Sequence, residues 1–239
     1  MRAIYLSAFS SILILISTGP AQAEADTLNP QQLVEECITP TPTVQQQSNV
    51  TIDVTSRQHP PRNFRYHRVK TPQRLALTPI VPGDPAYERV SGTSRLVDNE
   101  QHQPATAAQR SRWHWLFSEE LIEFGEISDY QLTLDSHYTM GKVDYYNITA
   151  VAKDPAATYR KRSLSLKRSA LESCRLIRAA YYDREDNLRK KLFLQWQNVN
   201  GIRVLKTAHI EDVHTLDSVK YTVENVRLKQ RANDLTSTP

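Results

Sequence analysis

Glycine is scarce in this sequence, with only six among 239 residues. Phosphate-binding loops and the sharp turns that carry nucleophilic serines depend on glycine. The chain contains no Gly-x-Ser-x-Gly motif, no glycine-rich phosphate loop and no His-Glu-x-x-His motif. Its paired acids, Glu119-Glu120 and Glu211-Asp212, are adjacent in sequence and therefore point to different sides of a strand or helix. The sequence predicts a protein that is not an enzyme and that needs no cofactor.

Cysteine is also scarce, because only Cys37 and Cys174 are present. An oxidising compartment permits a disulfide between them, but two buried small apolar side chains fit equally well, and no spacing motif decides. Two cysteines cannot supply a four-ligand metal site by themselves. The nearest histidines, His209 and His214, are five residues apart, which places them on opposite faces of a strand. We therefore predict no metal site.

The chain has only one long apolar run, and it lies at the N-terminus. Residues 1–23 have the layout of a secretory signal, with Arg2, an uncharged stretch over 3–18, and small residues at Ala21-Gln22-Ala23. We expect cleavage after Ala23 and a periplasmic location in a Gram-negative bacterium. The alternative is a retained membrane anchor, but about 16 residues that include several serines are short and polar for a span. The mature chain, residues 24–239, is expected to be soluble.

The overall charge is nearly balanced. Removal of Arg2 leaves 29 basic against 26 acidic residues, which gives no reason to expect nucleic acid as a partner. Residues 160–191 are more basic, with 11 Lys or Arg against four acids. Such a patch could contact anionic head groups or an acidic partner at a membrane surface, or it could consist of solvated strand positions. The predicted contact residues are Arg160, Lys161, Arg162, Arg189, Lys190 and Lys191, with Lys167 and Arg168 near the same rim.

Residues 24–111 are predicted to hold one short helix and a proline-rich irregular region. Asn29 can cap a helix that starts at Pro30 and ends before Pro40. Residues 39–50 resemble a linker, and residues 98–109 a mobile loop. Between Val50 and Pro85 the proline density predicts extended edges or irregular loops in place of central strands, with weak pairing to the sheet in part of the region.

Residues 112–239 are predicted to form a β domain, which together with 24–111 makes one structural unit. After a short helix at 116–124, segments with alternating apolar residues are separated by turns, as in a meander of six or seven antiparallel strands. The predicted fold is mainly β, with the meander curled into a half-open barrel and short covering helices. The inward-facing residues would line an apolar cavity or form a solid core: Leu132, Leu134, Tyr146, Ile148, Leu164, Leu166, Leu188, Leu192, Leu194 and Trp196.

Residues 112–235 resemble the family of outer membrane lipoprotein-sorting proteins, the LolA-like group. The resemblance lies in an ordered series of segments and not in a catalytic signature. In order, the segments are Arg112-Trp113-His114-Trp115-Leu116-Phe117, the strand from Gly141 to Ala150, Tyr159 to Leu166, Arg178-Ala179-Ala180-Tyr181-Tyr182-Asp183, Leu188-Arg189-Lys190-Lys191-Leu192, and Trp196 with Asn200-Gly201-Ile202.

The resemblance implies a half-open barrel, closed on its concave side by short helices, whose apolar cavity shelters the acyl chains of a lipoprotein or lipid. It implies an envelope transporter or lipoprotein receptor as a further partner, and peripheral contact with a membrane. The alternative function is a regulatory or accessory interaction protein of an envelope stress or transport system that uses the same fold.

Overall fold

The fold is one antiparallel β-sheet with a short helix, as a computed structural model shows for residues 29–38, 44–90, 93–98, 101–104, 106, 127–170 and 174–230. The helix α1 spans Pro30–Ile38, and a 3-10 turn, η2, spans Ile127–Asp129. The strands are β1 (Val44–Thr55), β2 (Arg62–Lys70), β3 (Arg74–Pro79), β4 (Ala86–Val90), β5 (Thr93–Asp98), β6 (Gln101–Pro104), β7 (Tyr130–Met140), β8 (Val143–Ala152), β9 (Lys161–Ser169), β10 (Arg175–Tyr182), β11 (Leu188–Val199), β12 (Ile202–Asp212) and β13 (Ser218–Gln230).

Two meanders make up the 13-stranded sheet. Its strand order is β6-β5-β4-β3-β2-β1-β13-β12-β11-β10-β9-β8-β7. The first meander, β1 to β6, joins the second, β7 to β13, through the pairing of β1 with β13. Among the described strands, β6 and β7 each have a single neighbour, so the sheet is not closed. The predicted mainly β fold with an antiparallel, half-open sheet is confirmed.

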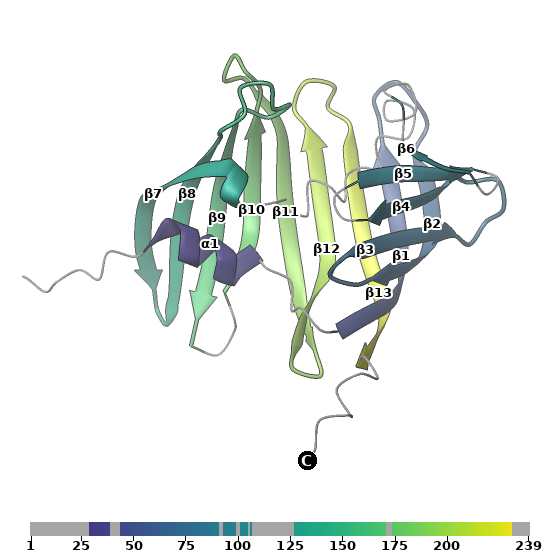
Figure 1. The fold of residues 1–239 in the computed structure, drawn as a ribbon, viewed down its shortest axis with the longest axis horizontal. Coiled ribbons are helices and arrows are strands. Elements are labelled where there is room, and N and C mark those ends of the chain that lie inside the picture. The colour runs from purple at the N-terminus through teal and green to yellow at the C-terminus, as the bar shows by residue number, and fades with distance from the viewer. Residues whose placement is uncertain are drawn as a thin grey trace, which may run out of the picture.

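The sheet is strongly curved, and α1 lies across one part of it (Figure 1). The helix contacts β7, β9 and β10. At the other end, β3 to β6 turn across β13 and β1, so that the sheet curls over its own inner face (Figure 1). One core cluster joins the two parts, because Leu75, Tyr87 and Leu96 from the curled end belong to it together with Leu164 and Leu192. The inner face of the sheet is therefore the core of the molecule.

The predicted helix is confirmed at residues 30–38. The side-chain Oδ1 of Asn29 accepts a hydrogen bond of 2.9 Å from the backbone N–H of Gln31, which satisfies one of the free donors at the helix start. Leu33, Val34 and Cys37 are buried, as the helical spacing predicted. The helix predicted at 116–124 lies outside the described residues.

The prediction of an irregular, proline-rich N-terminal region is wrong for residues 44–104, which form six strands. The prolines lie at turns and strand ends: Pro60-Pro61 separates β1 from β2, Pro72 lies in the next turn, and Pro82 and Pro85 lie between β3 and β4. A proline outside the ladder removes no hydrogen bond from it. As a result, β1 and β2 pair along nearly their full lengths as central strands.

Two expected loops also contain strand. The stretch 39–50, predicted as a linker, enters β1 at Val44, and its Gln45 to Gln47 pair with β13. Within 98–109, Gln101–Pro104 forms the short edge strand β6. Polar composition misled the prediction here, because strand residues with one solvent-facing side tolerate glutamine and serine.

The strands β7 to β13 agree with the alternating pattern, with four local register shifts, of which two move predicted inward-facing residues. A bulge at Ile177 places Leu176 opposite Leu166, so Leu176 and not Ile177 is buried. A second bulge at Arg189 places Leu188 opposite Tyr182 while Lys190 lies opposite Tyr181. An inserted residue reverses the face of the residues before it. The turn predicted at Asn198–Gly201 is present, and Asn200 and Gly201 both have positive φ, as two-residue hairpin turns require.

Candidate functional site

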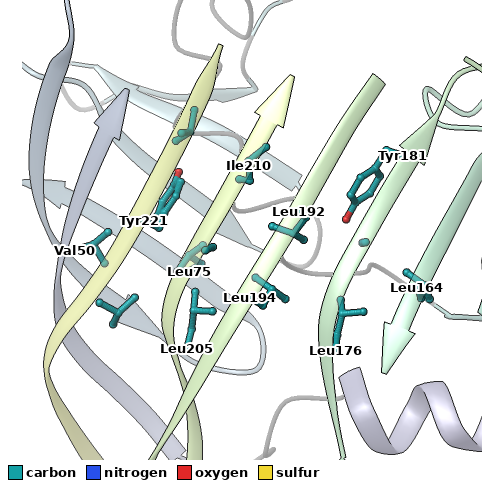
Figure 2. Packing of buried hydrophobic residues seen from close by; sticks show 14 of the residues in the cluster. Val50, Leu75, Leu164, Leu176, Tyr181, Leu192, Leu194, Leu205, Ile210 and Tyr221 are labelled. Atoms are coloured by element: carbon teal, nitrogen blue, oxygen red, sulfur yellow. The ribbon is translucent and has the colours of Figure 1, made fainter. Parts of the chain in front are cut away.

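A continuous apolar row crosses the inner face of the sheet. Residues directly opposite each other on paired strands share a face, so the register defines the row. From β7 to β1 it contains Leu134, Ile148, Leu164, Ala179, Leu192, Ile210, Val219 and Val54. A parallel row includes Leu194, Ala208, Tyr221 and Ile52. Figure 2 shows Leu164, Leu192 and Tyr221 projecting from their strands within this core.

The structure brings together all of the predicted cavity residues except Leu188. Six are buried in the core cluster, and Leu132, Leu134 and Trp196 pack against it while partly buried. Leu188 does not belong to the cluster, because the bulge at Arg189 moves it out of the row. The six buried ones are Tyr146, Ile148, Leu164, Leu166, Leu192 and Leu194.

The helix α1 covers one part of this face and is fastened to the sheet. Leu33 and Val34 belong to the same cluster as Leu164. Cys37 and Cys174 form a disulfide, with their Cα atoms 4.4 Å apart. The two alternatives that the sequence left open are thereby decided in favour of the disulfide, which ties the last turn of α1 to the residue before β10.

A charged row borders the apolar row at the end of the sheet where β10 turns into β11. It contains Arg162, Tyr181, Lys190 and Asp212, each opposite the next. The Arg162 guanidinium lies 4.6 Å from the ring centroid of Tyr130 and 5.3 Å from that of Tyr181. Burial lowers the pKa of Lys190, and the carboxylate of Asp212 partly opposes this. The inner face is therefore amphipathic, with cations at one margin.

The predicted basic contact residues divide between the two ends of the sheet. Lys161 and Arg162 lie opposite Tyr182 and Tyr181, at the same end as Arg189 to Lys191. Lys167 lies opposite Arg175 at the other end, and Arg168 follows it.

Several of these cations have partners nearby. Lys161 forms an ion pair with Asp186, Arg189 lies 3.8 Å from Asp183, and Arg160 donates to the carbonyl of Ala152 at 2.8 Å. Lys191 lies opposite Ala180 and Glu211, on the outer face. The charges at the β10–β11 end therefore belong to two faces of the sheet.

A second group of polar side chains, which includes Trp196 and Arg203, lies at the end of the sheet where β11 turns into β12. The indole N–H of Trp196 donates to the carbonyl of Leu176 at 2.7 Å, and the Arg203 guanidinium lies 5.3 Å from the ring centroid of Trp196. Glu36 of α1 is close enough to Arg203 for its charge to oppose the lowering of the Arg203 pKa by burial, and its Oε2 lies 3.5 Å from Nη2 of Arg168. This group joins α1, β9, β11 and β12 at the margin of the apolar rows.

The predicted cavity residues include none from the inner face of β1 to β5, although weak pairing of part of this region with the sheet was expected. Its buried side chains include Tyr66, Leu77 and Tyr87, each no more than 1% exposed. The signal was present in the alternation Phe64, Tyr66, Arg68, all three of which are buried. The neighbouring prolines concealed it.

No group of three or more His, Cys, Asp or Glu side chains that could hold a metal ion occurs among the described residues. None of the helices in that part of the chain has the length and apolarity needed to cross a bilayer.

Residues 116–238 match the sequence model of a protein family described as "Uncharacterized protein". The matched segment is slightly more than half of the chain. The chain belongs to this family. No curated protein matches it in sequence.

Solved structures share its fold. A LolA superfamily protein from Nitrosomonas europaea is 17% identical with a TM-score of 0.65, over 88% of this chain and 98% of that one. A DUF1329 family protein from Desulfovibrio piger is 15% identical with a TM-score of 0.51, over 81% and 88%. A putative outer membrane lipoprotein-sorting protein domain from Vibrio parahaemolyticus is 13% identical with a TM-score of 0.51, over 80% and 89%. The predicted resemblance to the LolA-like group is confirmed at the level of the fold.

Proposed function

We propose that the protein is a periplasmic binding protein that shelters the acyl chains of a lipoprotein or lipid on the inner face of its sheet, without catalysis. The observation that carries this proposal is the unbroken apolar row from Leu134 to Val54, one end of which is covered by a disulfide-fastened helix. Apolar side chains gain free energy when hydrocarbon takes the place of water around them. The fold shared with a lipoprotein-sorting domain supports the same function.

Small residues within the rows support a face that can admit a ligand. Ala150, Ala179 and Ala208 are all buried on the inner face, and the last two lie between larger apolar neighbours on the adjacent strands. An alanine side chain occupies less volume than leucine or phenylalanine would at the same position. Acyl chains are flexible and can occupy such irregular space once α1 moves aside.

Substitution of Ala179 by Phe tests the proposal. Ala179 lies between Leu164 and Leu192, so a phenyl ring there would compete with an acyl chain. We expect loss of binding to a fluorescent palmitoyl probe with little change in the midpoint of thermal unfolding. Ala180→Phe is the matched control, because Ala180 lies opposite Ser163 and Lys191 on the outer face, and it should bind the probe normally.

If side chains completely fill the inner face, Ala179→Phe should change the unfolding midpoint and not the binding of the probe. Extra volume in a well-packed core costs about 1–3 kcal/mol, so Ala179→Phe would then unfold at lower temperature. That result, together with a wild-type protein that does not bind the probe, contradicts the proposal. That result favours the alternative function, a regulatory or accessory interaction protein that binds another protein and no acyl ligand.

A further inference from the structure

Arg203 has an unusual environment for an arginine near the start of a strand. It lies opposite Asn198, and its guanidinium stacks against Trp196 at the margin of the inner face. Its Nη1 atom is buried and makes no hydrogen bond within the part of the chain that the structure describes. A buried guanidinium N–H without an acceptor is unfavourable, and such groups in native proteins call for an explanation.

Charged side chains of both signs lie near Arg203. Arg175 is near enough for its charge to lower the pKa of Arg203, in addition to the larger effect of burial, while Glu36 opposes both. Glu36 is shared, since its carboxylate also lies 3.5 Å from the guanidinium of Arg168. Glu36 is thus close to two arginines, Arg203 and Arg168, and Arg168 also lies opposite Asp144. The buried Nη1 of Arg203 remains without an acceptor among the described residues.

Guanidinium groups bind phosphate and carboxylate oxygens through parallel N–H donors, and they remain charged at all relevant pH values. Trp196 links this group to the apolar face, because its indole N–H is held by the carbonyl of Leu176 and the side chain of Leu176 is in the core cluster. An oxyanion at Arg203 would therefore lie beside the end of any chain that occupies the apolar rows.

We propose that Arg203 and Arg168 bind a phosphate-type oxyanion, the anionic head group of an acylated ligand whose chains lie on the inner face. The inference rests on the proposed function, which it extends from the acyl chains to the head group. Glu36 competes with the incoming anion for the same guanidinium groups. Its removal should therefore strengthen binding, and removal of Arg203 should weaken it.

The test compares two ligands with the same short acyl chains in calorimetric titrations of the mature, oxidised protein. Dihexanoyl phosphatidic acid carries the oxyanion and dihexanoylglycerol does not. We expect Arg203→Gln to weaken binding of the phosphatidic acid about tenfold or more, with no effect on the diacylglycerol. Lys206→Gln, an exposed change on the same strand, should leave both affinities unchanged. Glu36→Gln, at a half-exposed side chain, should tighten binding of the phosphatidic acid several-fold.

Each outcome has a distinct meaning. Equal affinity of the wild type, Arg203→Gln and Glu36→Gln for phosphatidic acid overturns the oxyanion site while leaving the acyl site standing. A wild type that binds neither lipid overturns the proposed function. Inorganic phosphate is the third ligand: if it binds as tightly as phosphatidic acid and Arg203→Gln abolishes this, the oxyanion site is supported with free phosphate as its source.

Discussion

The disulfide between Cys37 and Cys174 joins α1 to the residue before β10 across 137 positions of sequence. Its position makes it the covalent fastening of the helix that covers the inner face. A crosslink that closes so long a loop restricts the unfolded chain strongly, and loss of such a bond typically costs about 2–5 kcal/mol.

Replacement of both cysteines by alanine is therefore expected to lower the free energy of unfolding by about 2–5 kcal/mol, measured by urea denaturation of the mature protein. Wild-type protein kept reduced throughout should behave in the same way. A double variant as stable as the oxidised wild type would show that packing of Leu33 and Val34 alone holds the helix.

The hydroxyl of Tyr66 is buried and makes no hydrogen bond among the described residues. Burial raises the pKa of Tyr66 above its ordinary value, and Asp84 adds to the effect. Above about pH 10 the unfolded chain releases this proton while the folded protein retains it, so the free energy of unfolding falls as the pH rises. Each such tyrosine contributes a slope of up to about 1.4 kcal/mol per pH unit.

Tyr66→Phe removes one of these contributions. We expect stability at pH 7 to be unchanged or raised by up to about 1 kcal/mol, because the hydroxyl has no hydrogen-bond partner among the described residues to lose. Between pH 9 and 11 the decline in stability should be shallower than in the wild type. Tyr138→Phe, at an exposed ring, is the control. A decline as steep as that of the wild type would argue against a buried, protonated Tyr66.

The fold could be predicted from the sequence where apolar alternation was unbroken. Tyr146, Ile148 and Ala150 alternate without interruption, and their strand was predicted to within a few residues. The six strands of the first meander were not predicted, because the prediction relied on the number of prolines in the region and not on their positions. Pro60-Pro61 and Pro72 lie in turns, where they do not interrupt a strand.

The margins of the site could not be predicted, because they depend on register. The bulges at Ile177 and Arg189 decide which side chains reach the inner face, and nothing in the local sequence specifies them. The disulfide and the approach of Glu36 to Arg168 depend on where α1 docks, which is a tertiary contact. Arg203 was not among the predicted contact residues.

Lys161 and Lys191 supply a test of membrane contact, because both lie opposite outward-facing partners at the β10–β11 end. Each basic residue near an anionic surface contributes about 1 kcal/mol, over a range of about 8 Å in physiological salt. Changing both to Glu should weaken binding to phosphatidylglycerol-containing vesicles at least tenfold at low salt, measured by cosedimentation.

The control must alter the net charge equally. Lys206→Glu with Lys220→Glu does so at two exposed positions on β12 and β13. Binding that falls equally in both double variants would indicate a general charge effect, and unchanged binding in the first would mean that its lysines are ordinary solvated strand residues.

The account depends most directly on whether the inner face carries an acyl ligand in the cell. Native mass spectrometry of the protein isolated from periplasm under mild conditions measures this, with lipid extraction to identify the bound mass. We predict a population of the mature chain with an added mass that extraction assigns to an acylated molecule, reduced in Ala179→Phe and retained in Ala180→Phe. A protein that is entirely free of lipid and recovered in complex with another protein would contradict the account.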